Sequence, residues 1–327
     1  MDTYSGYKTL LIAFLLCSDR FKGDEKLERY MENANSDKLG LIEKLKGFIR
    51  LARPKQLTKN LSVFAALIFA KHVFEPDYFI KVLLGFFCFC LISSCVYILN
   101  DIVDANKDML HPKKKYRPIA AGIISKKEAV ALLLMLLPLV ITGSFLLDIY
   151  FGAVIAIYFA NNLLYSFKLK HVVIIDVMSI ALGFILRVVG GALAIRVYIS
   201  PWILLCTLLL SLFLGFSKRR NELLVLEGDA DRHRKILDEY SLSFIDNMLS
   251  IVTASTVMAY SLYTFSSSDN YNMMLTIPFV LYGIFRYQYI IYKKNEGGSP
   301  EETVMSDIPL IINILLWVVC STVILYL

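Results

Sequence analysis

Long apolar stretches separated by short charged segments dominate the pattern of this 327-residue chain. The hydrocarbon core of a bilayer is about 30 Å thick, so a helix needs roughly 20 apolar residues to cross it. Five stretches come close to that length without a single charged residue. They are residues 129–147, Ile149–Phe167, 197–217, 247–268 and 308–327. Each of them predicts a membrane-spanning helix.

Four further stretches are apolar but weaker. Residues 82–99 are nearly as long, and the neighbouring Lys81 can extend its charge to the membrane surface. The others are residues 60–74, residues 172–195 with Asp176 and Arg187, and residues 271–292 with Arg286. The pattern therefore predicts an all-α, polytopic membrane protein with about nine transmembrane helices.

The positions of Lys and Arg predict how these helices are oriented, because loops rich in Lys and Arg stay in the cytoplasm. With nine spans, the loops from residue 41 onward place 24 Lys and Arg residues on the side of the amino terminus and only Lys71, Lys81 and Arg196 on the opposite side. We therefore expect a multi-pass protein of the inner or plasma membrane with its charged loops in the cytoplasm. The carboxyl terminus would lie outside.

The composition supports a lipid environment. Apolar residues make up 57% of the chain and charged residues 19%, and the mean hydropathy is +0.59. Soluble domains contain about 45–50% apolar and about 25% charged residues. Six cysteines in a chain of this length do not form a disulfide framework, and the four histidines lack the spacing of zinc ligands. We expect the lipid bilayer as a partner and no nucleic acid.

The first 40 residues differ from the rest and are predicted to be an N-terminal extension, followed by a transmembrane domain over residues 41–327. Residues 10–17 are apolar and have the length of a signal-peptide core, but the flanking charges are poor for one. The alternative is a short extension before a helix at the membrane surface. Residues 39–51 favour that reading, because apolar side chains alternate with Lys and Glu at helical spacing.

Carboxylates cluster directly after the second predicted span. Asp101, Asp104 and Asp108 are spaced three and four residues apart, and Asn100 lies four residues before Asp104. On a helix all four side chains project to one side. Clustered carboxylates repel each other unless a cation neutralises them, and oxygen ligands suit Mg²⁺. The cluster predicts a Mg²⁺ site that binds a diphosphate; the alternative is a solvated acidic helix end.

Basic residues follow this cluster and recur in three other cytoplasmic segments. Arg117 lies beside Pro118 in a stiffened turn, which makes it the strongest candidate for binding phosphate. The positive-inside rule accounts for part of the charge. The predicted substrate-binding residues are Lys59, Arg117, Tyr165, Lys170, Arg187, Lys218, Arg219 and Glu222.

Arg187 differs from the other cations because it lies about ten residues inside the fifth predicted span. A charge at that depth is costly, so it indicates a functional site with a buried carboxylate or a lipid phosphate as its partner. Asp176 is eleven residues, roughly 16 Å, away along the helix axis. The lipid phosphate is therefore the favoured partner.

These motifs resemble those of the UbiA superfamily of intramembrane transferases. The first is NDxxDxxxD at residues 100–108, followed by RPIxxG at residues 117–122, and the second is RPxQxxKN at residues 53–60. The resemblance runs from about residue 48 to the end of the chain. It implies a UbiA-like bundle of nine helices with the active-site loops in the cytoplasm.

One departure from the family pattern matters. Most superfamily members are prenyltransferases with a second motif, DxxxD, after the sixth span, and here that loop reads SKRRNELLVLEGDAD. The chain resembles instead a branch of phosphoribosyltransferases, by residues 100–122, 165–171, 183–187 and 218–222 and a late run of Arg286, Tyr287, Pro300, Glu301 and Asp307. That resemblance implies 5-phosphoribose 1-diphosphate as the donor and a polyprenyl (decaprenyl-type) phosphate as the acceptor.

The charges fit such a reaction. The donor carries a diphosphate and a separate phosphate, and the acceptor carries another, so one metal site and many cations are expected. An acceptor phosphate is already anionic at pH 7 and needs no general base. We expect Asp101, Asp104 and Asp108 to be catalytic through bound Mg²⁺. The product, polyprenylphosphoryl-5-phosphoribose, would be a lipid-linked sugar donor for cell-envelope polysaccharides.

Two other functions compete with this one. The chain could be a prenyltransferase of the same superfamily, moving a prenyl group to an aromatic or lipid acceptor. It could also be a channel or lipid transporter, but that would require polar residues across the whole membrane, whereas the carboxylates stop at one face. The sequence leaves room for a homo-oligomer.

Overall fold

The computed structural model describes residue 40 and residues 42–110, 114–226, 235–266, 271–293, 298 and 300–326. No β-strand occurs among these residues. The long helices are α4 (Pro76–Asp108), α5 (Lys126–Leu147), α6 (Ile149–Phe167), α7 (Ile175–Ile195), α8 (Pro201–Leu226), α9 (Leu242–Ser266), α10 (Ile277–Lys293) and α12 (Ile308–Tyr326). The short ones are η2 (Pro54–Phe64), α3 (Ala65–Phe69), η3 (Lys114–Tyr116), η4 (Leu169–His171), η5 (Lys235–Glu239), η6 (Tyr271–Thr276) and α11 (Pro300–Ser306).

Eight helices in the described part of the chain are long and apolar enough to cross a membrane. A shorter apolar helix, Gln56–Phe69, precedes them. It consists of most of the 3₁₀-helix η2, which begins at Pro54, and the five-residue α-helix α3 that follows directly. The all-α fold with about nine transmembrane helices is therefore confirmed, and the first predicted span is the short one.

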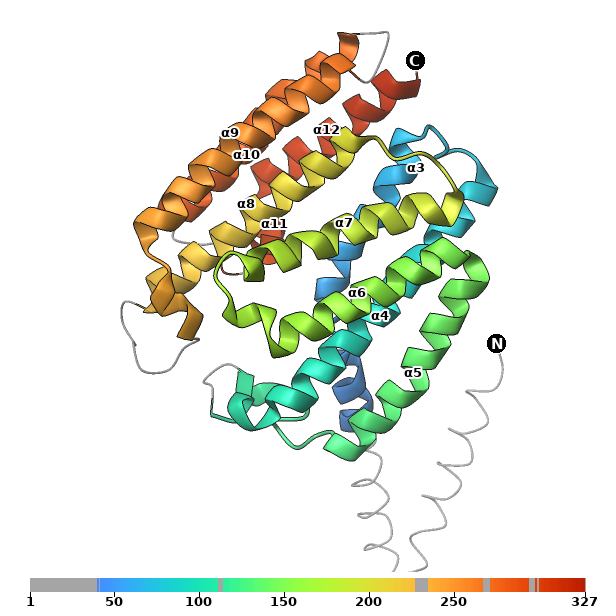
Figure 1. The fold of residues 1–327 in the computed structure, drawn as a ribbon, viewed down its shortest axis with the longest axis vertical. Coiled ribbons are helices and arrows are strands. Elements are labelled where there is room, and N and C mark those ends of the chain that lie inside the picture. The colour runs from blue at the N-terminus through green and yellow to red at the C-terminus, as the bar shows by residue number, and fades with distance from the viewer. Residues whose placement is uncertain are drawn as a thin grey trace, which may run out of the picture.

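Consecutive helices pack side by side from α4 through α9, and α10 packs against α12 (Figure 1). One hydrophobic core lies among η2, α4, α5, α6 and α7, and a second lies among α7, α8, α9, α10 and α12. Leu186 of α7 belongs to the first core and Val177 of the same helix to the second. Helix α7 therefore joins the two halves of the molecule.

The burial of the helices agrees with a lipid environment. In the most apolar 18 residues of α7, 61% of the residues are buried inside the protein. The same share is only 17% in α5 and in α12. Leu134, Met135 and Leu139 of α5 are all more than 60% exposed. An outward apolar surface of this extent, on helices long enough to cross a bilayer, is typical of a surface that contacts lipid. The chain is therefore a multi-pass membrane protein.

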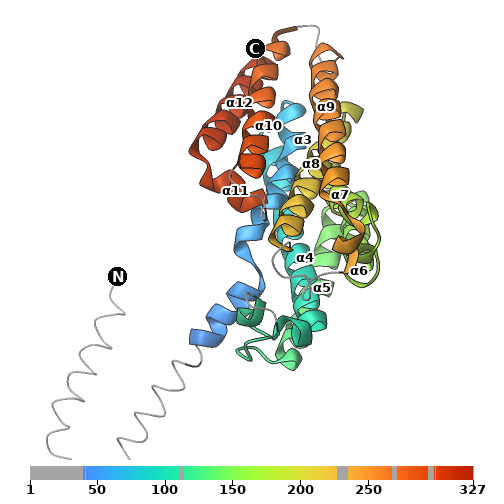
Figure 2. The same cartoon turned by 90° about the vertical axis from the view of Figure 1, so that its left-hand side faces the viewer.

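Residues 42–51 are helical and precede η2. Ile42, Leu45 and Ile49 are exposed, whereas Leu51 is fully buried, and Lys44 forms a 2.8 Å ion pair with Glu128 at the start of α5. The helix lies beside the rest of the molecule near the first turns of α5 (Figure 2). The predicted extension, residues 1–40, lies outside the described residues except for Gly40, so its boundary and both readings of it stay predictions.

The contact between η2 and α7 is unusually close. A Cβ atom built on Gly191 of α7 would lie 2.0 Å from the carbonyl oxygen of Val63 in η2. Only a residue without a side chain allows the two backbones to approach in this way. The short first span is therefore held against α7 by backbone contact.

We expect Gly191→Ala to lower the free energy of unfolding by about 1–3 kcal/mol, because overpacking forces the backbone of η2 away from α7. Gly143→Ala in α5 is the matched control, since a Cβ there meets nothing within 4 Å. Thermal unfolding of the two purified variants measures the difference. Equal melting temperatures would contradict the close-packing account.

Asp148 joins α5 and α6 at the face opposite the acidic cluster. Its carboxylate accepts hydrogen bonds from the amides of Tyr150 (2.8 Å) and Phe151 (3.2 Å) and from Nε of Arg196 (3.0 Å). Burial acts to raise the pKa of the Asp148 carboxyl, but these hydrogen bonds outweigh burial and hold the pKa below its usual value. The ionised carboxylate therefore stabilises the fold.

A lowered pKa in the folded state makes this contribution dependent on pH. The stabilisation is fully present above the unfolded pKa of about 3.9 and is lost as the pH falls through the lower folded pKa. We expect Asp148→Asn to melt below the wild type at pH 7 and the gap between them to narrow below pH 4. A gap that stays constant across this range would refute the assignment.

Candidate active site

The predicted metal-binding carboxylates lie on the last turns of α4. The helix continues without a break to Asp108, so residues seven apart stack on one face. Nη1 of Arg117 lies 3.1 Å from Asp101 and 2.6 Å from Asp108, which shows that these two carboxylates face the same point. Both are buried, whereas Asp104 is half-buried.

Arg53 approaches the same carboxylates from the start of η2. Its Nη2 forms an ion pair with Asp101, and its guanidinium lies over the ring of Tyr97, 5.0 Å from the centroid. Arg53 is the N-cap residue of η2 and has a left-handed backbone conformation, with φ 51°. The turn at Pro54 therefore aims this cation at α4.

The end of α6 and the short η4 complete this side of the site. Nζ of Lys170 lies 3.7 Å from Oδ1 of Asp104. The hydroxyl of Ser166 donates a hydrogen bond to Oδ1 of Asn100. Segments more than 60 residues apart in the sequence thus meet at the end of α4.

The carboxylates are neutralised by cations in this arrangement. Arg53, Arg117 and Lys170 face Asp101, Asp104 and Asp108, three positive charges against three negative ones. No group of three or more His, Cys, Asp or Glu side chains is gathered as a metal site within the described residues. The oxygen-only donors nevertheless suit Mg²⁺, so the Mg²⁺ site stays a prediction.

Arg219 of α8 forms the centre of a second charged cluster. It is 1% exposed and donates from Nε to Asp176 of α7 over 2.7 Å. Its Nη1 pairs with Glu222, and its Nη2 lies 3.4 Å from the hydroxyl of Tyr165. Three predicted substrate-binding residues, Tyr165, Arg219 and Glu222, are thus brought together.

Neighbouring cations on α8 point in different directions. Arg220 binds Asp246 of α9 at 2.8 Å, and its guanidinium stacks on the ring of Tyr292, 4.1 Å from the centroid. Lys218 is half-buried one residue before Arg219. Consecutive helical residues project about 100° apart, so Arg219 and Arg220 serve different neighbours.

Arg187 lies deep in α7 and is 5% exposed. It donates to Oδ1 of Asn60 (2.6 Å), to the carbonyl of Gly183 (2.9 Å) and to the hydroxyl of Tyr158 (2.7 Å). A buried carboxylate is one of the two partners expected for Arg187, with Asp176 as the candidate. That expectation is wrong among the described residues, because Asp176 forms its ion pair with Arg219. Lys59, another predicted site residue, is half-buried in η2 next to Asn60.

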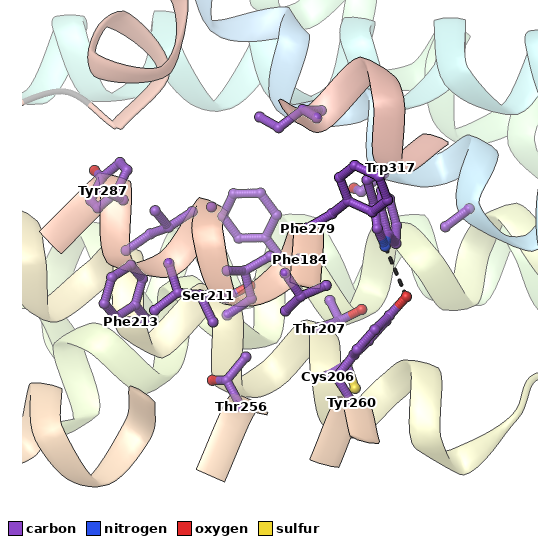
Figure 3. Close-up of a pocket in the computed structure, with 18 of the residues that line it drawn as sticks. Phe184, Cys206, Thr207, Ser211, Phe213, Thr256, Tyr260, Phe279, Tyr287 and Trp317 are labelled. Carbon is purple, nitrogen blue, oxygen red and sulfur yellow. Dashed lines mark hydrogen bonds between the residues drawn. The ribbon is translucent and has the colours of Figure 1, made fainter. Parts of the chain in front are cut away.

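An apolar cavity of about 500 Å³ opens among η2, α3, α7, α8, α9, α10 and α12. Figure 3 shows the rings of Phe184, Phe213 and Phe279 along it. Nε1 of Trp317 donates to the hydroxyl of Tyr260 over 2.8 Å, the pair joined by the dashed line in Figure 3. Since Phe184 also packs on the Arg187 guanidinium, the cavity lies next to that cation.

Sequence reasoning missed several of these residues. Arg53 lies within a recognised motif and could have been chosen for its charge. Asn60 and Ser166 carry no distinguishing pattern beyond their motifs. The cavity-lining residues look like any other apolar residues of a span, so only the fold reveals them.

Several solved structures resemble this fold, and two of them illustrate the likeness. A UbiA homologue from Archaeoglobus fulgidus, bound to GPP and Mg²⁺, has a TM-score of 0.65 and 17% sequence identity, and the match covers 86% of this chain and all of that one. Digeranylgeranylglyceryl phosphate synthase has a TM-score of 0.62 and 21% identity, covering 86% and 98%. At these identities the likeness concerns the fold.

Curated relatives are more similar in sequence. Decaprenyl-phosphate phosphoribosyltransferase of Corynebacterium glutamicum is 33% identical over 86% of this chain and 87% of its own length. The protein of the same name from Mycolicibacterium smegmatis is 34% identical over 83% and 90%. The model of the UbiA prenyltransferase family matches residues 60–305. The chain therefore belongs to the UbiA prenyltransferase family.

Proposed function

We propose that this protein transfers 5-phosphoribose from 5-phosphoribose 1-diphosphate to a polyprenyl phosphate of the decaprenyl type. The observation that carries the proposal is the gathering of Arg53, Arg117 and Lys170 around the acidic end of α4. Relatives that are 30–34% identical over most of the chain carry the name decaprenyl-phosphate phosphoribosyltransferase. The chain is thus a transferase.

The cations suit a donor with several phosphates. Arginine presents a planar fork of N–H donors that matches phosphate oxygens, and lysine supplies a compact charge. Arg53, Arg117 and Lys170 come from three segments of the chain and converge on one place. In the structure their partners are the carboxylates at the end of α4.

Asn100, Asp101, Asp104 and Asp108 would hold Mg²⁺, which when bound would neutralise charge on the departing diphosphate. In the structure, Arg53 forms an ion pair with Asp101 and Arg117 forms one with Asp108. With Mg²⁺ bound to these carboxylates, the two arginines would be free to donate hydrogen bonds to the donor phosphates.

The chemistry requires no base from the chain. An oxygen of the acceptor phosphate attacks the anomeric carbon of the ribose, and the bond from that carbon to the diphosphate oxygen breaks. Positive charge develops on the ribose as this bond lengthens. The role of the chain is to position the two substrates and to stabilise the leaving diphosphate with fixed cations.

The apolar cavity suits the first isoprene units of the acceptor. At about 500 Å³ it falls within the usual range for ligand pockets, roughly 300–1,000 Å³. It shares η2 and α7 with the cationic residues Lys59 and Arg187. A lipid lying in it would bring its phosphate toward the charged face, which we assign to the cytoplasm from the distribution of Lys and Arg.

Transfer of a prenyl group is the second candidate, because the solved relative from Archaeoglobus fulgidus binds GPP and Mg²⁺. Against it stands the end of α8, where Lys218, Arg219 and Arg220 occupy the place of the second acidic motif. Arg219 is committed to an ion pair with Asp176.

We expect the purified protein, in nanodiscs with Mg²⁺, to transfer label from radiolabelled 5-phosphoribose 1-diphosphate to decaprenyl phosphate. Mass spectrometry of the lipid extract should show polyprenylphosphoryl-5-phosphoribose. A parallel reaction contains a prenyl diphosphate with aromatic and lipid acceptors. Prenyl transfer without ribose transfer would move the assignment to the second candidate.

We also expect Asp104→Asn to reduce turnover at least a hundredfold, because about 3 kcal/mol of transition-state stabilisation corresponds to that factor. Its melting temperature should stay close to that of the wild type, since Asp104 is half-buried and has only a 3.7 Å contact to Lys170. Asp77→Asn, at the exposed opposite end of α4, is the matched control. Full activity of Asp104→Asn, or of the wild type in EDTA, would refute the metal assignment.

A further inference from the structure

The turn that connects η4 to α7 contains a strained residue. Ile174 has φ 69° and ψ −46°, a region that a β-branched side chain rarely enters. The amide of Ile175 donates to the carbonyl of Val173 over 2.8 Å, so the three residues form a γ-turn of the rare positive-φ type. Such a conformation persists only where the surrounding structure holds it in place.

A single hydroxyl from a distant segment holds this turn. The hydroxyl of Tyr240 accepts a hydrogen bond from the amide of Ile174 over 2.6 Å and donates one to Oδ1 of Asp176 over 2.8 Å. Tyr240 is 5% exposed and follows η5, 66 residues after the turn. Burial raises the pKa of the Tyr240 phenol, so the hydroxyl remains protonated and able to donate at neutral pH.

Apolar packing supports the same contact. Ile236, Leu237 and Tyr240 are buried in one cluster with Val177, and Val173 packs against that cluster. Val173 and Val177 lie on either side of the strained Ile174. The segment of η5 is therefore packed over the turn by apolar contacts. Apolar contacts are not directional, so the two hydrogen bonds of the Tyr240 hydroxyl are what fix its orientation relative to the turn.

Residues on both sides of the turn belong to the candidate active site. Before it, Lys170 of η4 lies beside Asp104. After it, the other carboxylate oxygen of Asp176 accepts from Arg219, which in turn binds Glu222. One short turn thus connects Lys170, which faces the end of α4, with Asp176, which belongs to the charged cluster at the end of α8.

We propose that Tyr240 is a positioning residue for the transfer reaction: its hydroxyl holds the strained turn at Ile174 and the Asp176 carboxylate together. In this way Tyr240 holds Lys170 in place beside Asp104. It also holds Arg219 in place through Asp176, and Arg219 in turn keeps Glu222 near Tyr165. The assignment of an effect on turnover rests on the proposed phosphoribosyl transfer. The effect on the turn itself does not.

Three variants test the proposal in the full-length protein: Tyr240→Phe, Ile174→Gly and the double variant. Tyr240→Phe removes both hydrogen bonds but keeps the ring and its packing. We expect kcat to fall at least tenfold, because a hydrogen bond to a charged group is lost, and amide hydrogen exchange in residues 169–178 to accelerate. Tyr150→Phe is the matched control, since Tyr150 is 68% exposed on the opposite side.

The double variant separates positioning from a general loss of stability. Glycine adopts a positive φ at no steric cost, so Ile174→Gly removes the strain that Tyr240 must hold. We expect the double variant to recover kcat to within about threefold of Ile174→Gly alone. A residue that merely supported packing would not be rescued in this way.

Several results would overturn the proposal. One is unchanged exchange in residues 169–178 of Tyr240→Phe; others are accelerated exchange with wild-type kcat, and a loss of kcat that Ile174→Gly does not restore. If the wild type fails to transfer ribose, the proposed function fails on its own. The exchange measurements then still decide the role of Tyr240 in the turn, and kcat is measured with a prenyl diphosphate as donor.

Discussion

The contact between η2 and α7 is the constraint on which the site depends. Gly191 lets the backbone of η2 approach α7, and Arg187, one turn earlier on α7, donates to Asn60 of η2. Because Arg53 is the N-cap residue of η2, any shift in this interface moves the cation that faces Asp101. The close packing of η2 on α7 inside the membrane region therefore determines where the charged side chain of Arg53 lies at the surface of that region.

Neutralisation of charge explains the remainder of the architecture. Unpaired charges are costly beside lipid, and several ion pairs join neighbouring helices. Arg219 ties α8 to α7 through Asp176, and Arg220 ties α8 to α9 through Asp246. Arg187 is the exception in kind, since carbonyl, amide and hydroxyl groups rather than a carboxylate surround it. The polar atoms of Asn60 and Tyr158 therefore replace the water that this cation gave up.

Local periodicity made the fold and part of the site predictable. The apolar stretches gave the helices, and the spacing of Asp101 and Asp108 matched their shared contact with Arg117, because both follow from 3.6 residues per turn. Pairings across long sequence separations could not be read in this way. Nothing near Arg219 indicates Asp176, 43 residues away, and nothing near Ile174 indicates Tyr240. The pattern also could not show that Arg187 has neutral partners, since burial next to Asn60 depends on how η2 folds back.

The shortness of the first span has a consequence for the order of assembly during synthesis. Gln56–Phe69 contains fewer residues than the roughly 20 that a bilayer requires, so it cannot rest stably across the membrane alone. Its binding surface on α7 is made 127 residues later, counted from Asn60 to Arg187. The ribosome therefore makes α4, α5 and α6 while η2, which also packs against α4, still lacks its contact with α7. The amino-terminal half of the active site is completed only when α7, the fourth long helix, has been made.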